Sequence, residues 1–159
     1  MVCTFFGHRD TPSEVSVLLK AILEFLITEK EVDCFYVGTQ GRFDSLARRE
    51  LQILQQAYPH IQCLTVLAYL TPRHADKQSE MFDTVYPEGL ETVPPRYALA
   101  KRNAWMVDNA DVVVTYAKYT FGHAWRLQEA ARKKGKVVYN LADIQAPLEK
   151  HLKPPFCRD

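Results

Sequence analysis

The chain has 159 residues, a length that suits a single domain. Hydrophobic residues make up 47% and charged residues 25% of the sequence, so a sizeable core can form without disulfides or a metal. The formal net charge is +1, so no overall field favours nucleic acid or a membrane surface. The N-terminus lacks the pattern of a signal peptide, and no apolar run reaches the roughly 18 residues of a membrane span, so we expect no membrane contact.

Short runs of β-branched and aromatic residues alternate with longer runs of helical periodicity along the chain. We expect strands at residues 2–6, 33–37, 61–69, 111–116 and 136–140. We expect helices at residues 11–26, 45–57, 96–109 and 122–134, the last one closed by Gly135. This alternation predicts an α/β protein with a three-layer, Rossmann-like fold, in which a mostly parallel five-stranded sheet has helices on both faces.

We expect one domain over residues 1–159, because no repeat or internal boundary is visible. Residues 71–95 carry four prolines, many charges and no clean period, which suggests a lid or a subunit contact. A plain surface insertion is the alternative. Residues 142–159 form a C-terminal tail with no clear pattern beyond one short helical stretch.

The cysteines and histidines lack the spacing of a cross-linked or metal-bound protein. The four cysteines are far apart, and Cys3, Cys34 and Cys63 fall inside apolar runs, where a free thiol behaves as a small buried hydrophobe. This favours a reducing, cytoplasmic location. The histidines are scattered, so we expect no metal site, and nothing in the sequence requires a cofactor.

Ligands in open α/β sheets bind at the carboxyl ends of the strands, near the point where the strand order reverses. Three segments follow predicted strands and can converge on one cleft, and Arg102 on the third predicted helix can reach the same place. The candidate ligand-binding residues are Gly7, His8, Arg9, Gly38, Thr39, Gln40, Gly41, Arg42, Phe43, Asp44, Arg102, Gly122 and His123.

The segment from Gly38 to Asp44 joins a strand to a helix and carries two glycines. Backbone N–H groups at such a turn have no intrahelical partner, and the helix dipole favours an anion there. The alternative is a well-formed turn that binds nothing. Asp44 is either a helix N-cap or an acceptor for a sugar hydroxyl or an exocyclic amine. Gly122 and His123 open the fourth predicted helix and form a second possible anion site.

Two basic side chains and a histidine have open roles. Arg9 follows the first strand and can contact a phosphate or stack on a base. Arg42 can pair with a phosphate or lie solvated on the surface. His8 serves either in acid–base chemistry or in a structural hydrogen bond.

These residues together resemble the SLOG superfamily of Rossmann-like domains, which includes the YpsA-like proteins, DNA-processing protein A and the Lonely Guy (LOG) phosphoribohydrolases. The resemblance covers roughly residues 2–141 and is closest to the YpsA-like branch. It is carried by Gly7-His8-Arg9, by Gly38-Thr39-Gln40-Gly41-Arg42-Phe43-Asp44, and by Arg102-Asn103-x-x-Met106-Val107-Asp108-x-Ala110-Asp111.

The resemblance implies a pocket for a nucleotide or a nucleotide derivative. In LOG enzymes an arginine on the third helix and a glutamate after Pro-Gly-Gly-x-Gly-Thr serve cleavage of the base–ribose bond. Arg102 falls on the arginine position, and Gln128 or Glu129 stands near the glutamate position. The glycine-rich segment departs from the enzymes: it reads Thr120-Phe121-Gly122-His123-Ala124-Trp125, where Phe121 and Trp125 would crowd a phosphate.

We therefore expect a cytoplasmic module that binds or senses a nucleotide-derived small molecule. The alternative is a nucleoside-monophosphate N-glycosidase with Arg102 and Glu129 as candidate catalytic residues. A weaker alternative is DNA binding, which the near-zero net charge disfavours. We also expect a homodimer, because the face around Trp105 and Met106 can pack against a second copy. The basic residues considered for DNA are Arg48, Arg49, Lys101, Arg102, Arg132, Lys133 and Lys134.

Overall fold

The structure, a computed structural model, describes residues 1–70 and 82–144. Within these ranges the sheet has six strands, all parallel, in the order β4-β3-β2-β1-β5-β6. The strands are β1 Val2–Gly7, β2 Cys34–Val37, β3 Gln62–Val66, β4 Asp83–Val85, β5 Val112–Tyr116 and β6 Val137–Asn140. The helices are α1 Val15–Glu29, α2 Gly41–Ala57, α3 Pro95–Asp108 and α4 His123–Lys133, with a short 3₁₀ turn, η2, at Leu90–Thr92.

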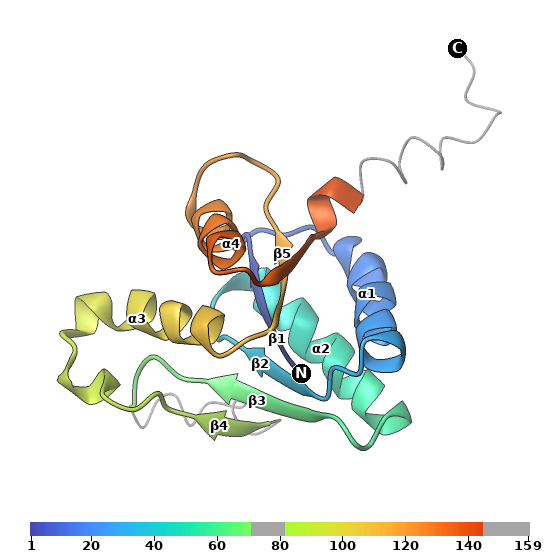
Figure 1. Ribbon diagram of the computed structural model, residues 1–159, viewed down its shortest axis with the longest axis horizontal. Coiled ribbons are helices and arrows are strands. Elements are labelled where there is room, and N and C mark those ends of the chain that lie inside the picture. The colour runs from blue at the N-terminus through green and yellow to red at the C-terminus, as the bar shows by residue number, and fades with distance from the viewer. Residues whose placement is uncertain (71–81, 145–159) are drawn as a thin grey trace, which may run out of the picture.

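The first strand lies in the middle of the sheet, between β2 and β5. The chain adds strands outward on the β2 side, then crosses back through α3 to β5 and builds the other half. Helices α1 and α2 cover one face, and α3 and α4 cover the other (Figure 1). The order reverses between β1 and β5, so this arrangement opens a crevice at the carboxyl ends of these strands. The predicted α/β, Rossmann-like fold is confirmed.

The α1/α2 face holds the larger core. Phe5 of β1 lies between Phe35 of β2 and Phe43 of α2, with ring centroids 6.2 Å and 6.5 Å away. All three rings are buried, and each buried aromatic side chain adds about 1.5–3 kcal/mol of hydrophobic stabilisation. This core fixes the first turn of α2 against the end of β1, which is where the cleft described below opens.

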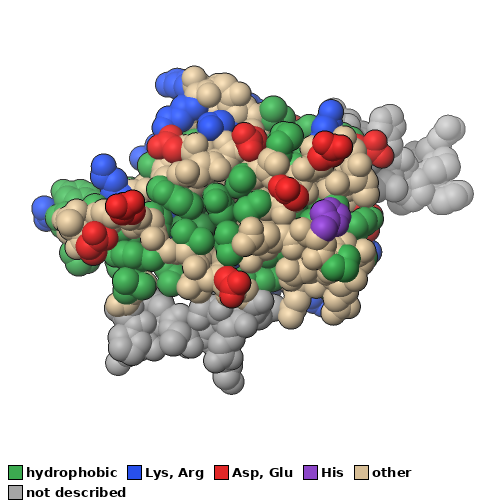
Figure 2. Space-filling view, turned by 60° about the horizontal axis from the view of Figure 1, so that its bottom comes forward, with side chains coloured by type: hydrophobic (Ala, Val, Ile, Leu, Met, Phe, Trp, Pro, Cys, Tyr) green, Lys and Arg blue, Asp and Glu red, His purple; other side chains and the backbone are tan. Residues whose placement is uncertain are grey.

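The α3/α4 face is packed less completely. Met106 and Val113 are buried in its centre, but Tyr36 and Trp105 are half-buried, with ring centroids 5.2 Å apart. Figure 2, in which the side of the molecule with α3, β3 and β4 comes forward, shows hydrophobic side chains gathered at its centre. The homodimer predicted from this helix face stays a prediction.

The prediction of five strands was one short. Strand β4 lies in the segment predicted as a lid or insertion and pairs with β3 at the edge of the sheet. Its three residues are exposed or half-buried, so they lack the apolar run that marks the inner strands. Residues 71–81 of the predicted lid, and residues 145–159 of the predicted tail, lie outside the described residues.

Helix α2 begins at Gly41, four residues earlier than predicted. The loop after β2 therefore has only three residues, Gly38 to Gln40, and Arg42, Phe43 and Asp44 lie on the first helical turn. The early start is possible because Gln40 has an extended backbone that fits an N-cap. The predicted end of α4 is confirmed, since Gly135 follows its C-cap with a φ of 75°.

Candidate functional site

A cleft of about 340 Å³ lies at the carboxyl ends of the central strands. Its walls come from the end of β1, the β2–α2 turn, one face of α3 and the first turn of α4. The lining residues are Phe6, Gly7, His8, Arg9, Gln40, Gly41, Asp44, Leu99, Arg102, Asn103, His123 and Ala124.

Arg102 is the central polar residue of this cleft. The residue is only 2% exposed, and every hydrogen bond that its side chain makes with a described residue goes to a neutral acceptor. Nη1 donates to Thr39 Oγ1 at 3.2 Å and to the Val66 carbonyl at 3.4 Å. Nη2 and Nε donate to Asn103 Oδ1 at 2.9 Å and 3.2 Å. Arg102 thus ties α3 to the ends of β2 and β3 with its charge still unmatched by an ion pair in the described chain.

Asn103 links this arginine to α4. Its side-chain amide donates to His123 Nε2 at 2.9 Å, while its carbonyl oxygen accepts from Arg102. Partial burial, helped by the positive charges of Arg126 and Arg102, lowers the pKa of His123, which favours the neutral ring that accepts this bond. We did not predict Asn103 as a site residue. Its place beside Arg102, on the helix face of Leu99, was the available signal.

Asp44 is the acidic residue of the cleft. Its carboxylate is buried and accepts from the Gln40 backbone N–H at 2.9 Å. Burial raises the pKa of Asp44 to about 6, against the opposing effects of that hydrogen bond, Arg102 and Arg48. Asp44 is not the N-cap itself, as one alternative had it; it reaches back from inside the helix to the N-cap residue Gln40.

The amides at the N-terminus of α2 are partly engaged within the protein. Gln40 N–H donates to Asp44, and Arg42 N–H donates to the Arg9 carbonyl at 3.0 Å. Gly41 has a φ of 79°, and a Cβ there would lie 2.9 Å from the Arg9 Cα. The glycine is therefore required by the close approach of the β1–α1 loop, and the turn satisfies two of the donors that we assigned to an anion.

The loop after β5 is built differently. Lys118 N–H donates to His8 Nε2 at 3.0 Å, and beyond this point residues 119–122 are exposed. Gly122 has a φ of 91° and precedes α4 without any side-chain cap. This is a structural hydrogen bond, one of the two alternatives for His8. Because Nε2 accepts it, the neutral ring carries its proton on Nδ1. Phe121 is 69% exposed and does not line the cleft, so it does not crowd it.

Eight of the predicted ligand-binding residues line the cleft: Gly7, His8, Arg9, Gln40, Gly41, Asp44, Arg102 and His123. Five do not: Gly38, Thr39, Arg42, Phe43 and Gly122. Thr39 instead accepts from Arg102, and Phe43 belongs to the core beneath Gly7. The structure adds Phe6, Leu99, Asn103 and Ala124.

Glu129, a candidate catalytic residue, lies away from the cleft. Its carboxylate pairs with Arg132 at 2.9 Å. The six residues that separate it from His123 correspond to about 9 Å along the helix axis. The acidic residue that lines the cleft is therefore Asp44, and Glu129 is not among the lining residues.

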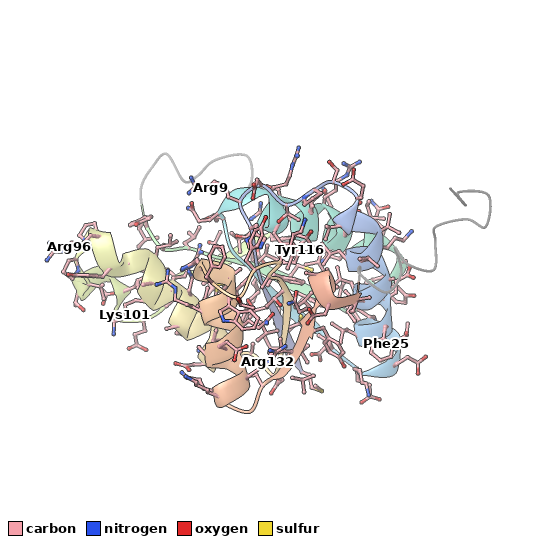
Figure 3. The ribbon with its side chains drawn as sticks, turned by 90° about the horizontal axis from the view of Figure 1, so that it is seen from above. Arg9, Phe25, Arg96, Lys101, Tyr116 and Arg132 are labelled. Carbon is pink, nitrogen blue, oxygen red and sulfur yellow. The ribbon has the colours of Figure 1, made fainter. Side chains whose placement is uncertain are left out.

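Two of the basic residues considered for DNA do not lie on the surface. Arg48 and Arg102 are buried, and an Arg48 Nη2 donates to the Gly38 carbonyl at 2.5 Å. Figure 3 shows Lys101 on α3 and Arg132 on α4, both apart from Arg9 at the cleft. A strip of phosphate-contacting side chains would need these groups on one face.

Within the described residues, no group of three or more His, Cys, Asp or Glu side chains lies close enough to hold a metal ion. The same part of the chain has no helix that is both long and apolar enough to cross a membrane. Cys3, Cys34 and Cys63 are free thiols in three neighbouring strands.

Comparisons with known proteins concern the fold. Neither the protein-family models nor the curated proteins include a match. Among solved structures, DNA processing protein A from Streptococcus pneumoniae is similar, with a TM-score of 0.62 and 18% sequence identity. The match covers 87% of this chain and 49% of that one, so this chain spans about half of its length. At this identity the likeness shows the shared Rossmann-like fold; the YpsA-like branch stays a prediction.

Proposed function

We propose that this protein binds a nucleotide or a nucleotide-derived ligand in the cleft, as a binding or sensing module of the SLOG type. The observation that carries the proposal is the buried guanidinium of Arg102 in the cleft wall. Arg102 is 2% exposed, and its hydrogen bonds with described residues go to Thr39, Val66 and Asn103, none of which is charged.

The neutral surroundings of the Arg102 guanidinium favour an anionic ligand. A buried charge costs several kcal/mol unless an opposite charge and hydrogen bonds offset it. The acceptors around Arg102 are neutral, and burial raises the pKa of Asp44, so the local anion is itself partly neutralised near pH 6. A phosphate at the cleft would supply the missing negative charge. Arg9, which is exposed at the cleft edge, can add a second contact.

Thermal shift measurements with AMP, ADP-ribose and NAD test this proposal. A ligand at 100 times its Kd stabilises the folded state by about 2.7 kcal/mol, enough for a clear shift. The Arg9→Ala variant should lose most of the shift, because it removes a cleft cation. Arg42→Ala is the matched control: Arg42 is also exposed and lies beside the same turn, but it does not line the cleft. No shift with any of the three ligands would contradict the proposal.

A second candidate function is hydrolysis of the base–ribose bond, and one observation favours it. Asp44 lines the cleft with a pKa raised to about 6, so it can hold or accept a proton near neutral pH. In this version Arg102 stabilises developing charge and Asp44 replaces Glu129 as the acidic group. Release of free adenine from AMP, lost in Asp44→Asn, is the expected result. Without base release from common nucleotides, the binding module stands alone.

A further inference from the structure

We infer that the loop between β5 and α4 presents a platform for a nucleobase. We call Tyr119 and Phe121 the aromatic ledge; it adjoins the cleft through His8. This inference rests on the proposed function, because it assigns the base-binding part of the same ligand site.

The rings form a continuous series from the cleft to the solvent. The His8 ring, which lines the cleft, has its centroid 5.7 Å from that of Tyr119. Tyr119 in turn stacks on Phe121, with centroids 5.3 Å apart and an interplanar angle of 19°. A part of the ligand that extends from the cleft past His8 therefore meets a pair of nearly parallel aromatic rings.

The base of the ledge is held in place. Tyr116, at the end of β5, meets the His8 ring edge-on, with centroids 5.7 Å apart and an interplanar angle of 83°. Lys118 N–H donates to His8 Nε2 on the same ring. These contacts fix the start of the loop to the end of β1, so the ledge keeps its position relative to the cleft, as a preorganised platform requires.

The ledge itself lacks a cover in the described chain. Tyr119 is 51% exposed and Phe121 is 69% exposed, on a loop that arches away from the body of the molecule (Figure 1). Two large rings in water forgo the stabilisation that they would gain from burial. Every nucleobase has a flat π face, and stacking on an aromatic side chain contributes about 1–3 kcal/mol per base.

The charges nearby orient the ligand. The phosphate end belongs at Arg102 and Arg9, since both line the cleft, and the uncharged base belongs at the ledge. The ledge therefore selects base-bearing ligands over the bare sugar phosphate, and a mononucleotide is the smallest such ligand that also carries a phosphate.

Calorimetric titration of the whole protein with AMP and with ribose 5-phosphate tests the ledge. AMP should bind about 5- to 150-fold more tightly, the range that corresponds to the stacking of one base. Phe121→Ala and Tyr119→Ala should weaken AMP binding by a similar factor and leave ribose 5-phosphate unchanged. Tyr97→Ala is the matched control, because Tyr97 on α3 is also 51% exposed but lies outside the cleft lining.

The outcomes separate the ledge from the proposed function. Equal binding of AMP and ribose 5-phosphate, unchanged in both ledge variants, overturns the ledge and leaves anion binding in place. Failure of the protein to bind either compound overturns both. If Phe121→Ala weakens a ten-nucleotide single strand of thymidylate but not AMP, the ledge serves a nucleic acid strand, and the mononucleotide inference is overturned.

Discussion

Two strand-to-helix turns meet at the same cleft, and they are built in opposite ways. The β2–α2 turn has three residues, and Asp44 and Arg9 occupy two of its backbone donors. The β5–α4 loop is longer and exposed, and Gly122 precedes its helix without a side-chain cap. In the first turn, which we call the closed turn, other groups of the protein accept hydrogen bonds from the backbone donors. In the second, which we call the open loop, residues 119–122 are exposed to solvent. The difference shows that a glycine before a helix does not by itself identify a ligand site.

The largest expected effect is on the closed turn, which depends on tight packing against β1. A Cβ added at Gly7 would lie 2.2 Å from the Phe43 Cγ, and that ring is buried in the core. Gly7→Ala must displace the ring or the strand, so we expect the free energy of unfolding to fall by about 3 kcal/mol. Urea denaturation measures this change. A loss below about 1 kcal/mol would mean that the first turn of α2 adapts easily. The β2–α2 turn would then not be the more tightly packed of the two.

The fold was largely predictable from the sequence, because the inner strands are apolar on both faces. Strand β5 is buried at all five positions, and its β-branched run is unmistakable. The edge strand β4 was missed because it lacks this apolar pattern: its residues are exposed or half-buried. Its pairing with β3 specifies it instead. Backbone pairing of this kind is set by the neighbouring strand, which one local window of sequence does not contain.

The site was predictable in outline and not in detail. The rule that ligands bind at strand ends selected His8, Arg9, Asp44 and Arg102, and the structure brings all four to one cleft. It did not indicate that Asp44 would turn back to Gln40, since that bond depends on where α2 begins. Helix boundaries follow from cap geometry, which the sequence constrains only loosely.

The second prediction uses Asp44, which joins the closed turn to the cleft. Burial raises the pKa of Asp44 from 3.8 to about 6, so the folded state holds this proton more tightly than the unfolded state does. The carboxyl therefore destabilises the fold increasingly as the pH rises from about 4 to about 6, and its penalty is constant above that range. At 1.36 kcal/mol per pKa unit, the full penalty is on the order of 3 kcal/mol.

Asp44→Asn removes this titration. The free energy of unfolding of the variant minus that of the natural protein should rise between about pH 4 and pH 6 and then level off. Urea denaturation at a series of pH values gives this difference. A difference that instead falls as the pH rises toward about 4, and is flat above it, would mean that Arg48 and Arg102 dominate over burial and that the closed turn holds a stable ion cluster.

The smallest expected effect is at the open loop. Gly122 has a φ of 91° and Gly89, before η2, has a φ of 84°; a Cβ at either would meet nothing within 4 Å. Replacing either residue with alanine therefore costs backbone strain without a clash, about 1–2 kcal/mol in the free energy of unfolding. The two variants form a matched pair, because Gly89 lies away from the cleft lining.

Their difference should appear in binding. Gly122→Ala alone should weaken AMP in calorimetric titration, because strain at Gly122 is relieved by moving the loop that carries Phe121 and the first turn of α4, where His123 lines the cleft. Similar stability losses with unequal binding losses would separate the backbone conformation of the open loop from its ligand contacts. Equal AMP binding by both variants would show that the backbone of the open loop does not contribute to the ligand site. The open loop and the closed turn would then differ only in their exposure to solvent.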